Sequence, residues 1–360
     1  MRVGIDAREL CGHPTGVGRY LSGLLAAWAI DPVAKRHEFI LYAHEPLGLH
    51  LDARHVFTRT VRGSGGTWWE QVRIPAAIGR DHLDVFFSPA YSTPLLLTIP
   101  TVVALHDLSF VAHPEWFSAR EGARRRWLAR RAAARARAVI TISEFSRQEI
   151  RNRFQVPDDR IHVIPPGVTT PTRESVRTPD GVRILYVGSI FNRRRVPDLI
   201  RAFAPIAAAH SQAALDLVGE NRTFPHQDLD RVIAHEGLNG RVHWKPYVSD
   251  EELSALYASA RVFAFLSEYE GLGLTPLEAL AAGVPPVLLD TAVARESCGE
   301  AALYVQPDDI RGTTAALTDL LFDTGQRAAL LAAAPRRLAR YNGPRAATET
   351  LNLLERCARP

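Results

Sequence analysis

The residue types best suited to chemistry in this sequence lie between Glu270 and Glu278. Gly271 and Gly273 allow backbone N–H groups to approach an anion, and a helix expected just after them would place its positive end at the same point. The two carboxylates bracket the turn and favour hydroxyl groups as partners, because they repel phosphate. A ligand that carries both phosphate and many hydroxyl groups is a sugar nucleotide.

Each of these carboxylates has an alternative role. Thr275, Pro276 and Glu278 also match a helix N-cap, a proline at the first helical position and a capping-box acid, so Glu278 fits a structural role at least as well. Glu270 fits no such cap. A carboxylate between a buried strand and a glycine turn is either solvated or engaged by a partner, because burying it alone is costly.

The elements that must position this segment follow from the hydrophobic pattern. Short apolar runs alternate with helical patterns along the chain, which predicts an α/β fold with parallel sheets flanked by helices. Strands are expected at 2–5, 38–42, 85–87, 102–105, 139–142, 161–163, 183–187, 214–218, 241–244, 262–265, 286–288 and 302–305. Helices are expected at 18–28, 118–137, 144–153, 196–210, 250–258, 276–282, 310–322, 325–341 and 345–359.

A chain of 360 residues favours two domains, and a segment rich in Pro, Thr and Gly near its middle indicates where they meet. We expect an N-terminal Rossmann-like domain over 1–170, a linker over 171–181 and a C-terminal Rossmann-like domain over 182–342. The residues 343–360 are expected to form a final helix, for which the N-terminal domain is the candidate docking surface.

Bulk composition narrows the class of protein. A formal charge of +4 is modest for this length and argues against a nucleic-acid binder. Cys11, Cys298 and Cys357 are far apart, so we expect no disulfide framework and no metal site. The N-terminus lacks a signal-peptide core, and the apolar stretch around 94–105 is too short to span a bilayer. We therefore expect a cytoplasmic protein.

Other candidate residues follow predicted strands, where ligands of open α/β sheets bind. Gly16 and Gly18 lie between the first strand and the first helix, and a plain glycine turn is the alternative. His106 directly follows a strand and can offer a hydrogen bond, or it can be a structural histidine bonded to a backbone carbonyl. Arg193 and Arg194 match phosphate oxygens, or they belong to a solvated basic loop.

Two charged patterns need separate interpretation. Asp228 and Asp230 form a DxD in a polar, helical segment away from any strand end, so we interpret them as a solvated surface pair rather than a metal site. The helix between Arg124 and Arg137 is strongly basic and carries Trp127. It either rests on an anionic membrane surface or is an exposed helix in an arginine-rich chain.

Taken together, the motifs resemble the retaining sugar-nucleotide glycosyltransferases of family 4, which have the GT-B fold. The resemblance covers most of the chain. It rests on Ile5-Asp6-Ala7-Arg8, Thr15-Gly16-Val17-Gly18-Arg19-Tyr20, Trp69-Glu70-Gln71, His106-Asp107-Leu108-Ser109-Phe110, Ile142-Ser143-Glu144-Phe145-Ser146, Tyr186-Val187-Gly188-Ser189, Tyr247-Val248-Ser249-Asp250, Glu296, Gly299, and Glu270 and Glu278 with seven residues between them.

The resemblance implies two doubly wound Rossmann-like domains facing across a cleft, with the nucleotide on the second and the acceptor on the first. Arg193 and Arg194 would hold the diphosphate, Glu278 the ribose hydroxyls, and Glu270 the donor sugar. The backbone from Gly271 through Leu272 and Gly273 to Leu274 would bond phosphate and sugar.

Further roles implied by the resemblance fall on Gly188 as part of the donor site and on Gly16 and Gly18, which would approach the diphosphate across the cleft. His106 would hydrogen-bond the transferred sugar near its reacting centre. The family usually has lysine where Arg194 stands; arginine keeps the charge.

The implied activity is metal-independent hexosyl transfer without a cofactor, from a GDP-, UDP- or dTDP-linked sugar, with GDP-mannose as the first choice. The acceptor would be a glycan or a lipid-linked oligosaccharide in surface-polysaccharide biosynthesis, at the inner face of the cell membrane if the basic helix binds lipid. The open alternatives are transfer to a soluble natural product, a non-hydrolysing sugar-nucleotide epimerase, and an inactive sugar-nucleotide-binding subunit. Front-face transfer and double displacement through a carboxylate both stay open.

Overall fold

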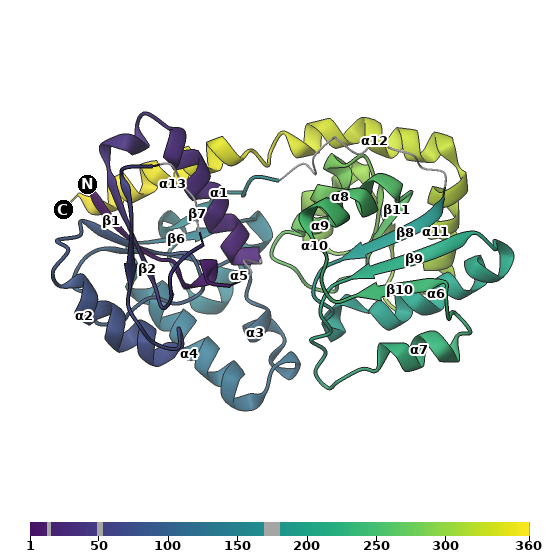
Figure 1. Cartoon of the computed structure of the whole chain (residues 1–360), viewed down its shortest axis with the longest axis horizontal. Coiled ribbons are helices and arrows are strands. Elements are labelled where there is room, and N and C mark those ends of the chain that lie inside the picture. Colours follow the sequence, from purple (N-terminus) through teal and green to yellow (C-terminus); the bar gives the residue numbers. More distant parts are fainter. Residues whose placement is uncertain (13–15, 49–52, 169–180, 360) are drawn as a thin grey trace. The chain divides into compact units, whose positions relative to one another are not determined.

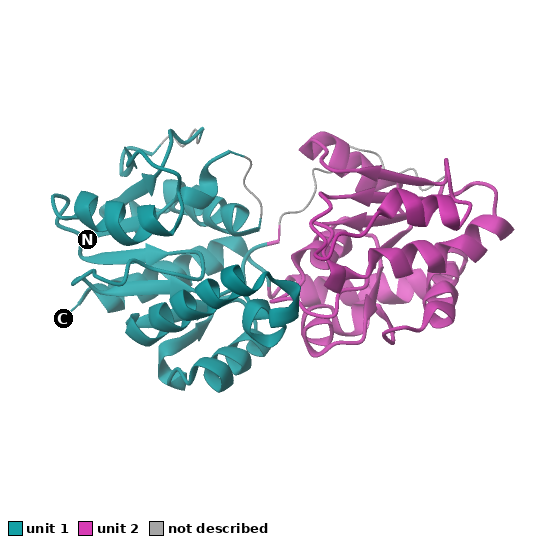
Figure 2. Cartoon of the chain, turned by 90° about the horizontal axis from the view of Figure 1, so that it is seen from below, with its two compact units in different colours: residues 1–167, 341–360 teal, residues 168–340 magenta. Residues whose placement is uncertain are grey.

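The computed structural model describes residues 1–12, 16–48, 53–168 and 181–359 (Figure 1). The chain divides into two compact units (Figure 2). Unit 1 comprises Met1–Gly167 and Tyr341–Pro360, and unit 2 comprises Val168–Arg340. The linker expected over 171–181 lies outside the described residues apart from its last position. Each unit is built on one parallel sheet, which confirms the predicted α/β class with two Rossmann-like units.

The described residues of unit 1 form a seven-stranded parallel sheet in the order β3-β2-β1-β4-β5-β6-β7. The strands are β1 Arg2–Asp6, β2 Glu38–Ala43, β3 Val56–Thr60, β4 Val85–Ser88, β5 Thr101–Ala104, β6 Ala138–Thr141 and β7 Ile161–Val163. The helices are α1 Gly16–Ile30, α2 Ile74–Ile78, α3 Ser109–Ala112, α4 Ala119–Arg135, α5 Glu144–Phe154 and α13 Gly343–Ala358.

The core of unit 1 joins the two ends of the chain. Trp28 of α1 stacks on Phe39 of β2 with ring centroids 4.8 Å apart, and both side chains are fully buried. The Trp28 indole N–H also donates to the carbonyl of Ala347 in α13 at 2.9 Å. Helix α13 therefore packs against α1 and covers the sheet through Leu351 and Leu354, which are buried in the same cluster.

The described residues of unit 2 form a six-stranded parallel sheet in the order β10-β9-β8-β11-β12-β13. The strands are β8 Val182–Val187, β9 Ala213–Val218, β10 Val242–Lys245, β11 Val262–Phe265, β12 Pro286–Leu289 and β13 Leu303–Val305. The helices are α6 Val196–Ala209, α7 Leu229–His235, α8 Asp250–Ser259, α9 Leu274–Ala281, α10 Ala292–Ser297, α11 Ile310–Phe322 and α12 Thr324–Leu338.

The elements that the hydrophobic pattern missed are short or exposed. Strand β3 is an edge strand whose last four residues are exposed, so it carries no apolar run to detect. Helix α7 is capped by Asp228, whose carboxylate accepts the backbone N–H of Arg231 at 3.0 Å. This gives the first acid of the DxD a structural role in the surface segment where the sequence placed it.

Each sheet has one point where the strand order reverses. In unit 1 this point lies between β1 and β4, and in unit 2 between β8 and β11. Ligands of open α/β sheets bind in the crevice outside the carboxyl ends of the strands at such a point. The segments that follow these four strands are therefore the first places to look for a site.

Candidate active site

The switch point of unit 2 brings together two segments that the sequence singled out. Gly188 follows β8 directly, and a short turn at Asn192–Arg194 comes before α6. The segment from Ser267 to Gly273 follows β11 and leads into α9. The residues predicted to bind a donor diphosphate and a donor sugar thus lie on neighbouring loops of one unit.

The two loops are joined by an ion pair between Arg194 and Glu270. The Arg194 Nε donates to Glu270 Oε1 at 2.8 Å, and one Nη donates to the carbonyl of Ser189 at 2.8 Å. The hydroxyl of Ser267 donates to the same carboxylate oxygen at 2.8 Å. Of the two outcomes left open for Glu270, solvated or engaged, the structure shows the engaged one.

Burial and charge act in opposite directions on this pair. Burial alone would raise the pKa of Glu270, but the Arg194 and Arg193 guanidinium groups outweigh it and hold that pKa below its ordinary value. Burial would lower the pKa of Arg194, and the Glu270 carboxylate raises it instead. Glu270 is therefore ionised at neutral pH and has no proton to give as a general acid.

Gly188 makes room for the guanidinium. Its φ is +142°, and a Cβ at this position would lie 2.6 Å from the Arg194 Nη1. A side chain would push the arginine away from Ser189 and Glu270. The glycine is thus required by the close approach of Arg194, in addition to any contact with a ligand.

Arg195 holds the same two loops from the other side. Its guanidinium pairs with Glu268 and Asp198 at 2.7 Å each, and also with Asp308. The backbone N–H of Glu268 donates to the carbonyl of Arg193 at 2.9 Å, so the loops are joined through main chain as well. Arg195 itself has a φ of +49°, a conformation that is costly outside glycine and is typical of functional sites. The sequence showed Arg195 only as the third member of an arginine run.

The start of α9 differs from the expectation. The helix begins at Leu274, and its N-cap is Gly273 with a φ of +86°, so Thr275 and Pro276 lie inside the first turn. The predicted cap at Thr275 is wrong, because the glycine turn starts the helix earlier. Glu278 then lies beyond the capping-box position, which removes that structural alternative. Its side chain is partly buried.

Leu272 is buried and Gly273 is partly buried beside a cavity of about 20 Å³ between the ends of β11 and β12. The cavity is lined by Ser267, Glu270, Gly273 and Ser297 among others. This volume holds about one water molecule. It cannot hold a hexose.

His106 follows β5 at the switch-point side of unit 1. Its side chain is buried, and its Nε2 lies 2.7 Å from the carbonyl oxygen of Pro89. A carbonyl only accepts, so Nε2 carries the proton and Nδ1 is the unprotonated nitrogen. Burial lowers the pKa of His106, which keeps the ring neutral. The bond to the Pro89 carbonyl matches the structural role that the sequence allowed for this histidine. If His106 also contacts a sugar, Nδ1 would accept the hydrogen bond.

Gly16 and Gly18 lie inside α1 rather than in a loop before it. The helix begins at Gly16, two residues earlier than expected, and residues 13–15 lie outside the described chain. Gly16 is exposed, and a Cβ at this position would meet no heavy atom of the described residues within 4 Å, whereas Gly18 is buried. Their position at the first turn of a helix keeps backbone N–H groups available to an anion, and their contact with a diphosphate stays a prediction.

One group of possible metal ligands occurs among the described residues. The ligand atoms of Cys11, His44 and Glu45 lie within 4.8 Å of one another. Cys11 and His44 are only partly buried and Glu45 is exposed, and such a group near the surface does not by itself indicate a bound ion. We assign no metal to it.

The basic helix α4 is largely exposed. Arg124 and Arg125 both pair with Glu121, at 2.7 Å each, so part of its charge is neutralised locally. Trp127 is 56% exposed, and the guanidinium of Arg131 lies 5.8 Å from its ring centre. No helix in the described ranges is both long enough and apolar enough to cross a membrane.

Comparisons with known proteins agree across the chain. The family described as Glycosyltransferase Family 4 matches residues 14–171, and the family described as Glycosyl transferases group 1 matches residues 170–337. O-antigen chain mannosyltransferase B of Escherichia coli is 27% identical over 285 residues, covering 76% of this chain and 74% of that protein. MMP alpha-(1->4)-mannosyltransferase of Mycolicibacterium hassiacum is 32% identical over 241 residues, covering 63% of this chain and 56% of that protein.

Solved structures give the same fold. Sucrose-phosphate synthase from Thermosynechococcus elongatus has a TM-score of 0.79 at 18% identity, covering 99% of this chain and 98% of that one. WaaG, a glycosyltransferase involved in lipopolysaccharide biosynthesis, has a TM-score of 0.75 at 16% identity, covering 98% and 99%. HepE from Anabaena in complex with UDP and glucose has a TM-score of 0.73 at 19% identity, covering 98% and 99%.

Proposed function

The chain belongs to the glycosyltransferases that combine a family 4 half with a group 1 half on a GT-B fold, and we propose that it transfers a hexose from a sugar nucleotide to a hydroxyl group of a glycan or lipid-linked acceptor. The observation that carries this proposal is the Arg194–Glu270 pair at the switch point of unit 2. It sets a cation and a carboxylate beside a glycine turn that opens a helix.

This arrangement suits the two chemical halves of a sugar nucleotide. The guanidinium groups of Arg193 and Arg194 attract the diphosphate, and the N-terminus of α9 adds a positive end. Glu270 and Glu278 accept hydrogen bonds from hydroxyl groups of the sugar and the ribose. We take mannose from GDP-mannose as the donor, because both relatives named above are called mannosyltransferases.

The transfer step requires no protein acid. The bond from C1 of the hexose to the β-phosphate oxygen breaks, the acceptor oxygen bonds to C1, and the acceptor proton passes to the leaving phosphate oxygen. Arg193 and Arg194 lower the barrier by stabilising the charge that develops on the diphosphate. We favour front-face transfer with retention. Glu270 is a poor nucleophile for double displacement, because the guanidinium groups that lower its pKa also stabilise its negative charge.

The acceptor is proposed to be lipid-linked and to be used at the inner face of the cell membrane. Helix α4 presents Arg131, Arg135 and the indole of Trp127 on its exposed side. Arginines attract anionic headgroups, and tryptophan lies at the membrane interface. The first relative acts, by its name, on an O-antigen chain, which fits a surface polysaccharide.

The test is a panel of GDP-, UDP- and dTDP-linked sugars, measured by thermal stabilisation and then by transfer to lipid-linked and soluble glycan acceptors. One nucleotide should stabilise unit 2, by RT ln(1 + [L]/Kd), and the Arg194→Gln variant should lose that effect. Stabilisation with product formed only on a soluble acceptor would refute the lipid-linked part. Isomerised donor in the absence of acceptor would identify an epimerase, and the absence of any stabilisation would refute the donor site.

A further inference from the structure

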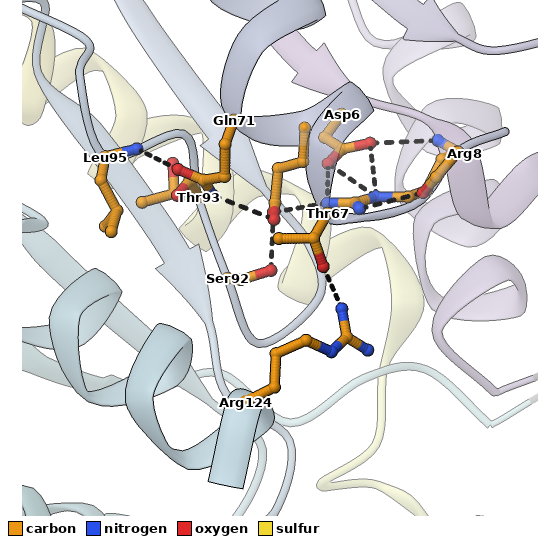
Figure 3. Close-up of polar contacts among 10 residues, drawn as sticks. Asp6, Arg8, Thr67, Gln71, Ser92, Thr93, Leu95 and Arg124 are labelled. Atoms are coloured by element: carbon orange, nitrogen blue, oxygen red, sulfur yellow. Dashed lines mark hydrogen bonds and ion pairs between the residues drawn. The ribbon is translucent and has the colours of Figure 1, made fainter. Parts of the chain in front are cut away.

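A buried ionic network lies at the carboxyl end of β1 in unit 1, outside the donor site proposed for unit 2 (Figure 3). Arg8 donates to both oxygens of Asp6, with the shortest bond 2.6 Å, and its Nη2 bonds Glu70 at 2.5 Å. Asp6 and Glu70 are 3% and 1% exposed. Two carboxylates thus share one guanidinium at the switch point of the sheet, where a site is expected.

Glu70 cannot reach a substrate from this position. Its Oε1 accepts from Arg8 and from the hydroxyl of Ser92 at 2.6 Å, and its Oε2 accepts from Gln71 at 3.1 Å. Both oxygens are bonded and buried, so a ligand could bond Glu70 only by displacing protein groups. A buried carboxylate with all its bonds inside the protein acts through the groups that it holds.

Besides Arg8 and Gln71, Glu70 holds Ser92, which belongs to the loop after β4. Ser92 is bonded directly to Glu70, and the neighbouring Gln71 bonds this loop twice more. Gln71 donates to the carbonyl of Thr93 at 3.0 Å and accepts the backbone N–H of Leu95 at 3.0 Å (Figure 3). Glu70 and Gln71 both come from a π-helical segment, Trp69–Arg73, and such segments are frequent at functional sites.

The clamped loop contacts His106 through two residues, Pro89 and Tyr91. Pro89 supplies the carbonyl that fixes the Nε2 proton. Tyr91 has a φ of +42°, and its ring meets the imidazole edge-on at 5.8 Å while its hydroxyl bonds Asp107 at 2.8 Å. The ring of Tyr20 in α1 also meets the imidazole edge-on, with the ring centroids 4.9 Å apart. A tyrosine in the left-handed region persists only where its surroundings over-determine it. The backbone N–H of Tyr91 donates to the carbonyl of Ala104 at 2.9 Å, and the bond from the adjacent Ser92 to Glu70 adds to that constraint.

We propose that Glu70 is a positioning residue, which through Ser92 clamps the Pro89–Tyr91 turn and thereby holds His106 as the Nε2–H tautomer with Nδ1 as its open acceptor. Nδ1 would then accept a hydrogen bond from a hydroxyl of the bound sugar or acceptor. The consequence for turnover rests on the proposed function, whereas the tautomer of His106 does not.

The experiment is imidazole ¹⁵N NMR of the full chain, together with transfer kinetics. The chain has 13 histidines, and His106 is assigned by its loss in His106→Gln. The wild type should show His106 as one Nε2–H tautomer. Ser92→Ala should give a mixture of His106 tautomers. Its turnover should fall by about tenfold, because a hydrogen bond to a charged group is lost, and its KM for the donor should not change. Ser92→Thr keeps the hydroxyl and should restore both.

Thr313→Val in unit 2 is the matched control, because it deletes a buried hydroxyl that donates to the carbonyl of Asp309 at 2.8 Å far from this network in sequence. It should leave the His106 signals unchanged. A wild-type Nδ1–H tautomer, or Ser92→Ala with unchanged His106 signals, would overturn the proposal even if turnover fell. A shifted tautomer in a protein that transfers no sugar would support the clamp and refute the proposed function instead.

Discussion

Replacing Glu270 by glutamine removes one charge from the Arg194 ion pair and keeps the shape of the side chain. The Arg194 and Glu270 side chains are 14% and 17% exposed, so solvent screens the pair only weakly. Removing one partner of a buried pair costs about 3–5 kcal/mol when nothing replaces it. The amide oxygen can still accept from Arg194 and Ser267, and we therefore expect a loss of about 1–3 kcal/mol at pH 7.

The loss should depend on pH with a definite sign. Burial raises the pKa of Glu270, but Arg194 and Arg193 outweigh it, so the folded pKa lies below the ordinary value of 4.5. A carboxylate with a lowered folded pKa contributes stability above its unfolded pKa and loses it as the pH falls through the folded value. The stability difference between wild type and Glu270→Gln should be constant near neutral pH and shrink below about pH 4.5.

The assay compares stability with turnover. For a loss of about 2 kcal/mol, the melting temperature of the unit 2 transition should fall by about 4–8 °C. Turnover should fall by about a hundredfold, the scale of losing one electrostatic contact to the transition state. Asp216→Asn is the control. Asp216 pairs with Arg183 at 2.8 Å on the strands of the same unit, so it matches the loss of an ion pair away from the switch-point loops.

Two results would refute this reasoning. If Glu270→Gln kept turnover within about threefold of Asp216→Asn, Glu270 would have no role beyond the structural pair. If the stability difference grew rather than shrank in acid, the pKa of Glu270 would be raised in the folded state and the sign of the coupling to Arg194 would be wrong.

Three further outcomes follow from the same geometry. Gly188→Ala should displace Arg194 and weaken nucleotide binding about tenfold in titration calorimetry. Gly237 has a φ of +69°, and a Cβ there would meet no heavy atom of the described residues within 4 Å, so Gly237→Ala should bind the nucleotide normally. Equal losses of affinity in the two variants would contradict the steric argument. Glu278→Gln should bind ribonucleoside and 2′,3′-dideoxyribonucleoside diphosphates with nearly equal affinity, and retained discrimination would remove Glu278 from the ribose contact. Trp127→Ser should reduce co-sedimentation with phosphatidylglycerol vesicles several-fold, and no binding by the wild type would refute the membrane role of α4.

The sheets were predictable because buried parallel strands carry continuous apolar runs. Strand β8 was expected over 183–187 and spans Val182–Val187, and β11 was expected over 262–265 and spans Val262–Phe265. Strand β3 was not found, because an edge strand that faces water has no such run. The hydrophobic pattern therefore indicates which strands are buried, and it does not detect a strand that faces water.

The site was predictable to the level of loops and not of contacts. Arg194 and Glu270 were both expected after predicted strands, and the strand order places the ends of those two strands side by side. Arg194 and Glu270 are 76 residues apart in the sequence. Whether their side chains bond each other depends on the conformations of two loops, which no local sequence pattern encodes. The start of α9 was misjudged for a similar reason, since Gly273 and Thr275 both suit an N-cap and only the backbone of the turn decides between them.

The guanidinium at Arg194, where the family resemblance leads one to expect lysine, has a reason in the number of its donors. Glu270 and the carbonyl of Ser189 both bond it, and its face lies 4.9 Å from the ring centre of Phe265. Two such bonds would leave one N–H donor in an ammonium group but three of the five in a guanidinium. An arginine can thus be fixed by its own unit and still bond two or more phosphate oxygens, whereas a lysine that made the same two bonds would keep one donor for the diphosphate.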